Sequence, residues 1–218
     1  MDVPPLTALN TWVLPALLGL GLASATGLRT FLPLLLLALA AKFEFAGVRL
    51  NDQMAWLAGW PAISALALAA TVEFAGDKIP AVDHALNALG FVTRPIAGAV
   101  AAGSVFWGVD PMVAAMAGVI VGAPTALAFN AAQGGMRVAS TATTGGLGNP
   151  IVSLVEDVLA VFTVILSLLA PILVPLLLVV LAVVVMRIGK RLKRGREVPP
   201  SHARRTSAQV WSSRILGS

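Results

Sequence analysis

The residues with the clearest chemical potential surround an arginine in an apolar stretch. Arg29 is the only charged residue in the range 12–41, and Ser24 and Thr26 lie close to it. An uncompensated arginine deep in a bilayer costs roughly 3 kcal/mol on insertion scales. A guanidinium beside hydroxyl groups and a helix break suits a phosphate or a carboxylate. We predict that Arg29, Ser24 and Thr26 bind the substrate; the alternative is that Arg29 snorkels to an interface or pairs with a carboxylate.

A second polar group of residues follows in the other half of the chain. Asn130, Gln133 and Arg137 precede a segment rich in glycine and threonine that carries no charge. We expect these three side chains to complete the substrate site. The segment 131–149 is either a re-entrant loop that lines a cavity or an ordinary cytoplasmic loop, because irregular backbone is tolerated at depth only where it is shielded from lipid.

Three carboxylates and one histidine follow the second apolar run, at Glu73, Asp77, Asp83 and His84. On a continuous helix Glu73 and Asp77 share one face, since they are four residues apart. Such a set is able to coordinate a divalent cation such as Mg²⁺ or Mn²⁺, or to relay protons. The ordinary alternative is that salt bridges from Lys78 or Arg94 occupy these acids.

A pair of adjacent acids, Glu156 and Asp157, lies inside the fifth apolar run. Adjacent residues cannot share a helix face, so we expect one acid to meet an arginine and the other to face water or a proton path. Pairing of Glu156 with Arg29 or Arg137 lowers the insertion cost of both partners. The residues that we expect to couple transport to protons or ions are Glu73, Asp77, Glu156 and Asp157.

The composition of the chain indicates that membrane helices position these residues. The 218-residue chain is 58% hydrophobic and only 11% charged, which is far from the mixture of a soluble domain. It contains no cysteine, which excludes disulfides and thiol catalysis. We predict an all-α, polytopic membrane bundle with six crossings, near 12–41 (broken at Arg29), 54–75, 94–108, 111–130, 150–170 and 171–187.

The sequence also aligns weakly with itself. Segment 25–29 matches 133–137, and segment 59–64 matches 148–153. We predict a 3+3 inverted repeat with halves 1–94 and 95–187, a plan common among transporters, in which Arg29 and Arg137 approach each other near the midplane. Chance alignment in an apolar chain of low complexity is the alternative.

The C-terminal segment differs in character from the integral membrane domain 1–187. Residues 187–218 hold nine Lys/Arg against Glu197 alone, a net charge of +8. The positive-inside rule therefore predicts that 188–218 is a mobile, basic, cytoplasmic tail. Segment 187–214 is suited to anionic lipids in the bilayer. No aromatic residues are interleaved with its basic cluster, so we expect no nucleic-acid partner; a homo-oligomer remains an open alternative.

Two segments carry a family resemblance. Ser24–Pro33 and Glu73–Asp83 combine charges with glycine and proline at fixed offsets, and they resemble a bacterial multi-pass family catalogued as domain of unknown function 4126 (DUF4126). The resemblance covers most of 10–187. It implies an integral protein of the bacterial cytoplasmic membrane but supplies no activity, cofactor or catalytic residue.

These observations favour a transport protein, either a carrier or a channel. Its substrate is a small anionic or polar solute or a lipid phosphate headgroup, and proton coupling is an option. The alternatives are a metal-dependent enzyme embedded in the membrane and a structural or assembly protein. The sequence contains no Ser/His/Asp elbow and no HExxH helix, so we expect that the protein is not an enzyme. We expect no cofactor, and a divalent cation is the one candidate for a bound cofactor.

Overall fold

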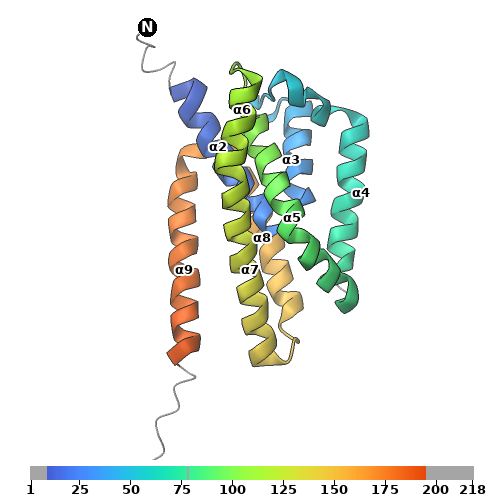
Figure 1. The fold of residues 1–218 in the computed structure, drawn as a ribbon, viewed down its shortest axis with the longest axis vertical. Coiled ribbons are helices and arrows are strands. Elements are labelled where there is room, and N and C mark those ends of the chain that lie inside the picture. Colours follow the sequence, from blue (N-terminus) through green and yellow to red (C-terminus); the bar gives the residue numbers. More distant parts are fainter. Residues whose placement is uncertain (1–8, 78, 195–218) are drawn as a thin grey trace, which may run out of the picture. The chain divides into compact units, whose positions relative to one another are not determined.

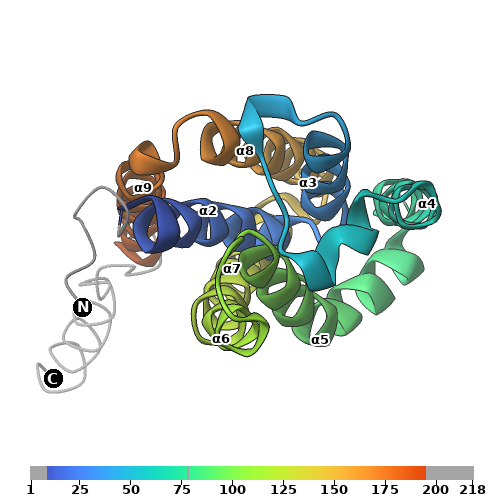
Figure 2. The same cartoon turned by 90° about the horizontal axis from the view of Figure 1, so that it is seen from above.

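The computed structural model describes residues 9–77 and 79–194, and these residues form helices and turns without a strand. The contacts divide the chain into two compact units, Met1–Val179 and Val180–Ser218. The helices, shown in Figures 1 and 2, are α2 (Leu14–Leu28), α3 (Phe31–Lys42), α4 (Trp60–Gly76), α5 (Pro80–Ser104), α6 (Pro111–Ala117), α7 (Ala123–Thr144), α8 (Asn149–Leu169) and α9 (Val174–Arg194). Short π or 3₁₀ turns are η1 (Leu9–Val13), η2 (Phe45–Gly47), η3 (Asp52–Ala58), η4 (Gly118–Gly122) and η5 (Pro171–Leu173).

The predicted all-helical membrane bundle is confirmed, but the count of six crossings is not. Among the described residues, four helices are long and apolar enough to span a bilayer: Leu9–Leu28, Ala85–Ser104, Pro111–Thr144 and Asn149–Leu169. A fifth is obtained if η3 and α4, which meet at a bend of 62°, form one span. α9 extends to Arg194, so the first residues of the predicted mobile tail are helical, and residues 195–218 lie outside the described part.

The first apolar run is broken at Arg29 as predicted, but it does not cross the bundle. Trp12 packs against Phe106 with ring centroids 6.5 Å apart, and the Lys42 ammonium lies 5.5 Å above the ring of Trp60. Both ends of the α2–α3 pair therefore lie at the end of the bundle where α5 stops and α4 starts, and Figure 1 shows the two helices meeting inside it. Because hydropathy measures length and not direction, the sequence did not distinguish this hairpin from a crossing.

Two segments that we expected to be loops are helical. Residues 76–94 connect two of the predicted crossings, 54–75 and 94–108, yet α5 begins at Pro80 and continues through Pro95. Residues 131–149 form neither a re-entrant loop nor a long cytoplasmic loop, since α7 runs to Thr144 and only a short turn precedes α8. Prolines and glycines within membrane helices are tolerated because neighbouring helices satisfy the freed backbone groups.

The self-alignment is matched in one place only. Gly59 and Gly148 are both N-caps, each followed two residues later by a proline in the first helical turn, where no N–H partner is needed. By contrast, Arg29 lies at a helix break while Arg137 lies within α7. The inverted repeat therefore stays a prediction.

Small residues bring α5 and η4 into close contact. A Cβ added to Gly122 would lie 2.2 Å from the carbonyl oxygen of Gly98, and one added to Gly118 would lie 2.7 Å from the amide nitrogen of Gly103. Backbones approach this closely only where side chains are absent. Around this glycine seam (Gly98, Gly103, Gly118 and Gly122), α5 holds α2 and α7 in place, and the buried core includes Leu22, Leu37, Ala101, Val105 and Val164.

Candidate functional site

The break between α2 and α3 is the centre of a buried polar site. Arg29 has extended backbone angles (φ −135°, ψ 127°) and separates the two helices. The backbone N–H groups of Thr30 and Phe31 donate to the two carboxylate oxygens of Glu73, at 2.9 and 3.1 Å. The first N–H groups of a helix lack internal partners and carry partial positive charge. Glu73 of α4 therefore caps α3 with a matching negative charge.

The opposite end of the break is capped by a cation. Arg94 of α5 is 4% exposed, and its Nη1 donates to the carbonyl oxygen of Gly27, near the C-terminus of α2, at 3.0 Å. The same atom donates to Asn130 Oδ1 at 2.7 Å and to Gln133 Oε1. A cation at a helix C-terminus complements the macrodipole. Arg94 was predicted only as a salt-bridge partner of nearby acids, although a lone charge beside a proline in an apolar run was an available signal.

Arg29 is held by carboxylates. It is 2% exposed and forms ion pairs with Asp77 and with Asp157, whose Oδ1 lies 2.5 Å from Nε. Its Nη2 donates to Ser153 Oγ at 2.7 Å, and this hydroxyl donates to Asp77 Oδ2 at 2.9 Å. Ser153, absent from our predicted site, thus links α8 to the end of α4. The alternative in which Arg29 pairs with carboxylates from other helices is the one that the structure contains.

Arg137 contacts Asp77, the same carboxylate that pairs with Arg29. Its Nη2 lies 3.4 Å from Asp77 Oδ2 and 2.7 Å from Glu156 Oε2, and its Nη1 pairs with Asp83. The predicted approach of Arg29 and Arg137, and the predicted pairing of Glu156 with an arginine, are both present. Of the Glu156–Asp157 pair, Glu156 is buried against Arg137, while Asp157 meets Arg29 and is 16% exposed. The expectation that the second acid faces water or a proton path stays a prediction.

These contacts form one continuous network. Gln133 accepts from Arg94 and donates to Glu156 Oε2 at 2.6 Å, which joins the Arg94 group to the Arg137 group. We call the following set the charge network: Arg29, Arg94, Arg137, Glu73, Asp77, Asp83, Glu156 and Asp157. Within the described part of the chain, five carboxylates against three guanidinium groups leave a formal charge of −2. The positive end of α3 offsets about half a charge of this excess.

The other predicted substrate ligands are engaged differently. The hydroxyls of Ser24 and Thr26 are buried and donate to their own helix, to Leu20 O at 2.7 Å and Ala23 O at 2.8 Å. Asn130 uses its oxygen on Arg94, while its buried Nδ2 and the buried Nε of Arg94 have no partner among the described residues. The structure therefore brings Asn130, Gln133 and Arg137 into one network with Arg29, and leaves Ser24 and Thr26 as helix-internal donors.

The predicted metal ligands are separated by their partners. Glu73 caps α3, Asp77 bridges Arg29 and Arg137, and Asp83 pairs with Arg137. The side chain of His84 lies outside the described residues. Within the described part, no three His, Cys, Asp or Glu side chains form a group that could hold a metal ion.

A half-open groove of about 390 Å³ reaches the charge network from the outside of α3. We call it the α3 groove. Arg29, Glu73 and Asp157 line its polar end, and leucines of α3 with small and aromatic residues of α4 line the rest. Figure 2 shows α3 flanked by α8 on one side and α4 on the other.

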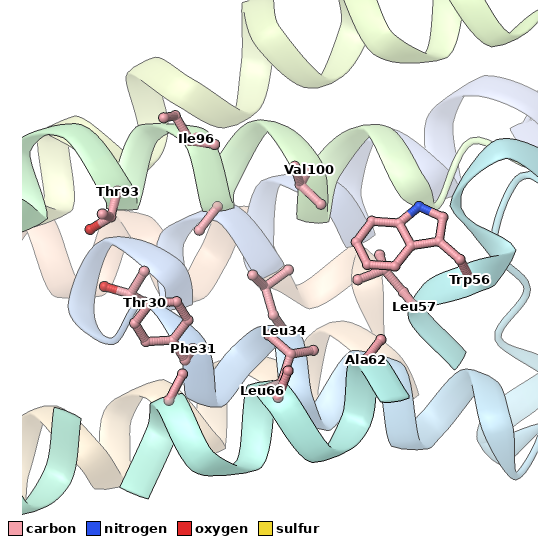
Figure 3. A pocket seen from close by; sticks show the side chains of 13 residues that line it. Thr30, Phe31, Leu34, Trp56, Leu57, Ala62, Leu66, Thr93, Ile96 and Val100 are labelled. Atoms are coloured by element: carbon pink, nitrogen blue, oxygen red, sulfur yellow. The ribbon is translucent and has the colours of Figure 1, made fainter. Parts of the chain in front are cut away.

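A second groove, of about 440 Å³, lies between α3, α4 and α5 and is almost entirely apolar. Figure 3 shows Leu34 and Leu66 facing each other within it, with Trp56 at one end and Thr30 and Thr93 at the other. We call it the apolar groove. It has no charged lining residue, so it provides a comparison for the α3 groove.

Comparison with known proteins identifies a family. The family described as Domain of unknown function (DUF4126) matches residues 16–191, and the chain belongs to it. Neither the curated proteins nor the solved structures gave a match. The match confirms the resemblance drawn from Ser24–Pro33 and Glu73–Asp83, and it extends through the whole charge network.

Proposed function

We propose that this member of the DUF4126 family is a membrane transport protein, a carrier or channel for a small polar substrate, with proton coupling through its buried carboxylates. The chain carries several apolar helices of spanning length. Its basic residues after the last apolar helix support a cytoplasmic C-terminus in a bacterial inner membrane.

The observation that carries this proposal is the charge network itself. Eight ionisable side chains converge around a helix break, and several of them lie within helices long enough to span a bilayer. Charges at such depth are expensive and, by default, mark substrate or ion paths and proton relays. Broken helices in transporters place their ends at the substrate or ion site. A path for a polar species is the function that best accounts for this cost.

The charge balance of the network narrows the class of substrate that we propose. Arg29 and Arg137 already contact four carboxylates between them, so an anionic substrate would have to displace an acid and add to a negative site. A cationic substrate or a proton neutralises part of the excess negative charge, and a neutral polar substrate adds nothing to it. The sequence predicted an anionic or polar solute or a phosphate headgroup, and of these we favour the polar solute, to which we add a cationic one.

The test is flux in proteoliposomes with a trapped pH-sensitive dye. Small amines, polyols and organic acids are supplied in turn to wild-type protein, and proton movement is recorded. We expect movement with a subset of amines or polyols. We expect Glu156→Gln to reduce it strongly, because an amide cannot take up and release the proton that a buried carboxylate relays. Glu44→Gln is the control, since Glu44 is exposed and outside the charge network.

A structural or assembly role is the second candidate, and a specific observation favours it. Both arginines that contact Asp77 are fully engaged by side chains of other helices, as expected of residues that hold a bundle together. If this role is correct, wild-type protein gives no flux with any class of substrate, and Arg29→Ala is detected only as a loss of folded protein. Proton flux that Glu156→Gln abolishes while the protein stays folded excludes it.

A metal-dependent enzyme is the weakest proposal. The carboxylates that would bind the ion are already used by arginines and by the α3 N-terminus. Elemental analysis of protein purified without chelator decides the matter: one divalent ion per chain, lost in Asp83→Asn, supports the enzyme, and its absence removes the proposal.

A further inference from the structure

We infer that the α3 groove binds an amphiphile with a single hydrocarbon chain and a cationic amine head group. The inference rests on the proposed transport function for its purpose, because it names the substrate class of that site, but the binding itself can be measured without flux.

The α3 groove is divided into two chemical zones. Its polar end is formed by Arg29, Glu73 and Asp157, while Leu32, Leu35 and Phe74 provide apolar wall. A volume of about 390 Å³ lies within the range of ordinary small-molecule sites, roughly 300–1,000 Å³. An apolar site with a few charged groups at one end fits a ligand that is itself divided into chain and head.

The polar end of the α3 groove carries more carboxylates than guanidinium groups. Asp157 is 16% exposed, against 2% for Arg29, so the carboxylate is the more accessible of the two partners. Glu73, whose carboxylate caps α3, also lines this groove and adds a second negative charge beside it. The formal charge of −2 on the described network means that an ammonium group lowers the electrostatic cost of the site, whereas a phosphate raises it. An ammonium also supplies three donors to oxygens that accept several hydrogen bonds each.

The α3 groove is accessible from the outside of the helix bundle. The groove is half-open, and Leu32 and Leu35 on α3 and Phe74 on α4 are each at least partly exposed. A ligand in the bilayer therefore reaches the polar end along an apolar path without crossing the helix bundle. The head group would meet Asp157 first and then lie beside the carboxylate that caps α3.

The experiment uses full-length protein in lipid nanodiscs and three photoreactive dodecyl probes that differ only in head group: amine, phosphate and alcohol. Labelled peptides are mapped by mass spectrometry. We expect the amine probe to label α3 and α4 peptides of the α3 groove about tenfold more than the phosphate or alcohol probe, the effect of about one charge-assisted hydrogen bond. Asp157→Asn should remove most of this preference.

Filling the groove gives a matched pair of variants. Leu32→Trp inserts a ring into the α3 groove, while Leu66→Trp inserts one into the apolar groove, and both leucines are half-buried. We expect amine labelling to fall about tenfold in Leu32→Trp and to stay at the wild-type level in Leu66→Trp. The comparison of head groups in wild-type protein needs no variant and decides the inference even if Leu32→Trp does not fold.

Each result has a clear meaning. Equal labelling by the three probes, or stronger labelling by the phosphate probe, overturns the inference. Proton flux without selective amine labelling overturns it while leaving the proposed function intact. Selective amine labelling without any flux supports the binding site and contradicts the transport function.

Discussion

The glycine seam and the helix break bring helices together in opposite ways. At the seam, α5 and η4 meet through backbone atoms, because no side chain separates Gly98 from Gly122. At the break, α2 and α3 are joined to α4, α5 and α8 through charged side chains that satisfy exposed helix ends. The seam depends on shape and tolerates no added atom, whereas the break depends on charge and can in principle exchange one partner for another. The seam is therefore a rigid contact, and the break is a contact whose partners are able to change.

The largest effect is expected at the break. Arg29→Ala leaves Asp77 and Asp157 without their shared cation, and removing one partner of a buried ion pair costs about 3–5 kcal/mol. Thermal unfolding in detergent, followed by the loss of a monodisperse chromatographic peak, measures the loss. Arg49→Ala is the control, because Arg49 is exposed and lies 6.0 Å from the ring of Trp107, a contact of about 0.5–1 kcal/mol. Equal stability of the two variants would show that the charge network does not hold the bundle together.

A smaller effect is expected at the seam. Gly122→Ala places a methyl group against the carbonyl of Gly98, and overpacking costs about 1–3 kcal/mol. Gly135→Ala is the matched control further along the same long helical segment, since nothing lies within 4 Å of its added Cβ. There the gain in helix propensity, about 1 kcal/mol, should stabilise the protein. The same unfolding assay tests both, and opposite signs of the two changes are the expected result.

The smallest effect concerns the cap of α3. Glu73→Gln keeps one acceptor for the Thr30 and Phe31 amides but removes the charge, which is worth about 0.3–1 kcal/mol at a helix N-terminus and up to about 2 in partly buried geometry. Hydrogen exchange of these two amides should accelerate while the amides of α8 are unchanged. Uniform acceleration throughout the bundle would mean that Glu73 supports the global fold and not the local cap.

Part of this arrangement follows from the sequence. Arg29, the one charge in the apolar run 12–41, predicts a break in that run, because a charge at such depth is costly. The pairing of Glu156 with an arginine follows from the cost of burying either charge alone. In each case a local physical rule was sufficient, and the structure agrees with it.

The remainder depends on tertiary contacts that one sequence does not display. Residues 131–144 are rich in poor helix formers, yet Gln133 and Arg137 are held by side chains of α5 and α8, and tertiary contacts override propensity. The role of Arg94 requires knowing that Gly27, in the last turn of α2, lies beside it. The return of α3 toward the start of α2 depends on the direction of one extended residue, which hydropathy does not encode.

That return has a consequence for sidedness. Asn10, before α2, and Glu44, after α3, are both exposed, and a chain that doubles back between them presents both to one aqueous compartment. The protein contains no cysteine, so a single cysteine introduced at either position is the only site that a maleimide can label. An impermeant maleimide added outside sealed vesicles should modify both or neither, whereas a first segment that traversed the bilayer would leave one of the pair protected.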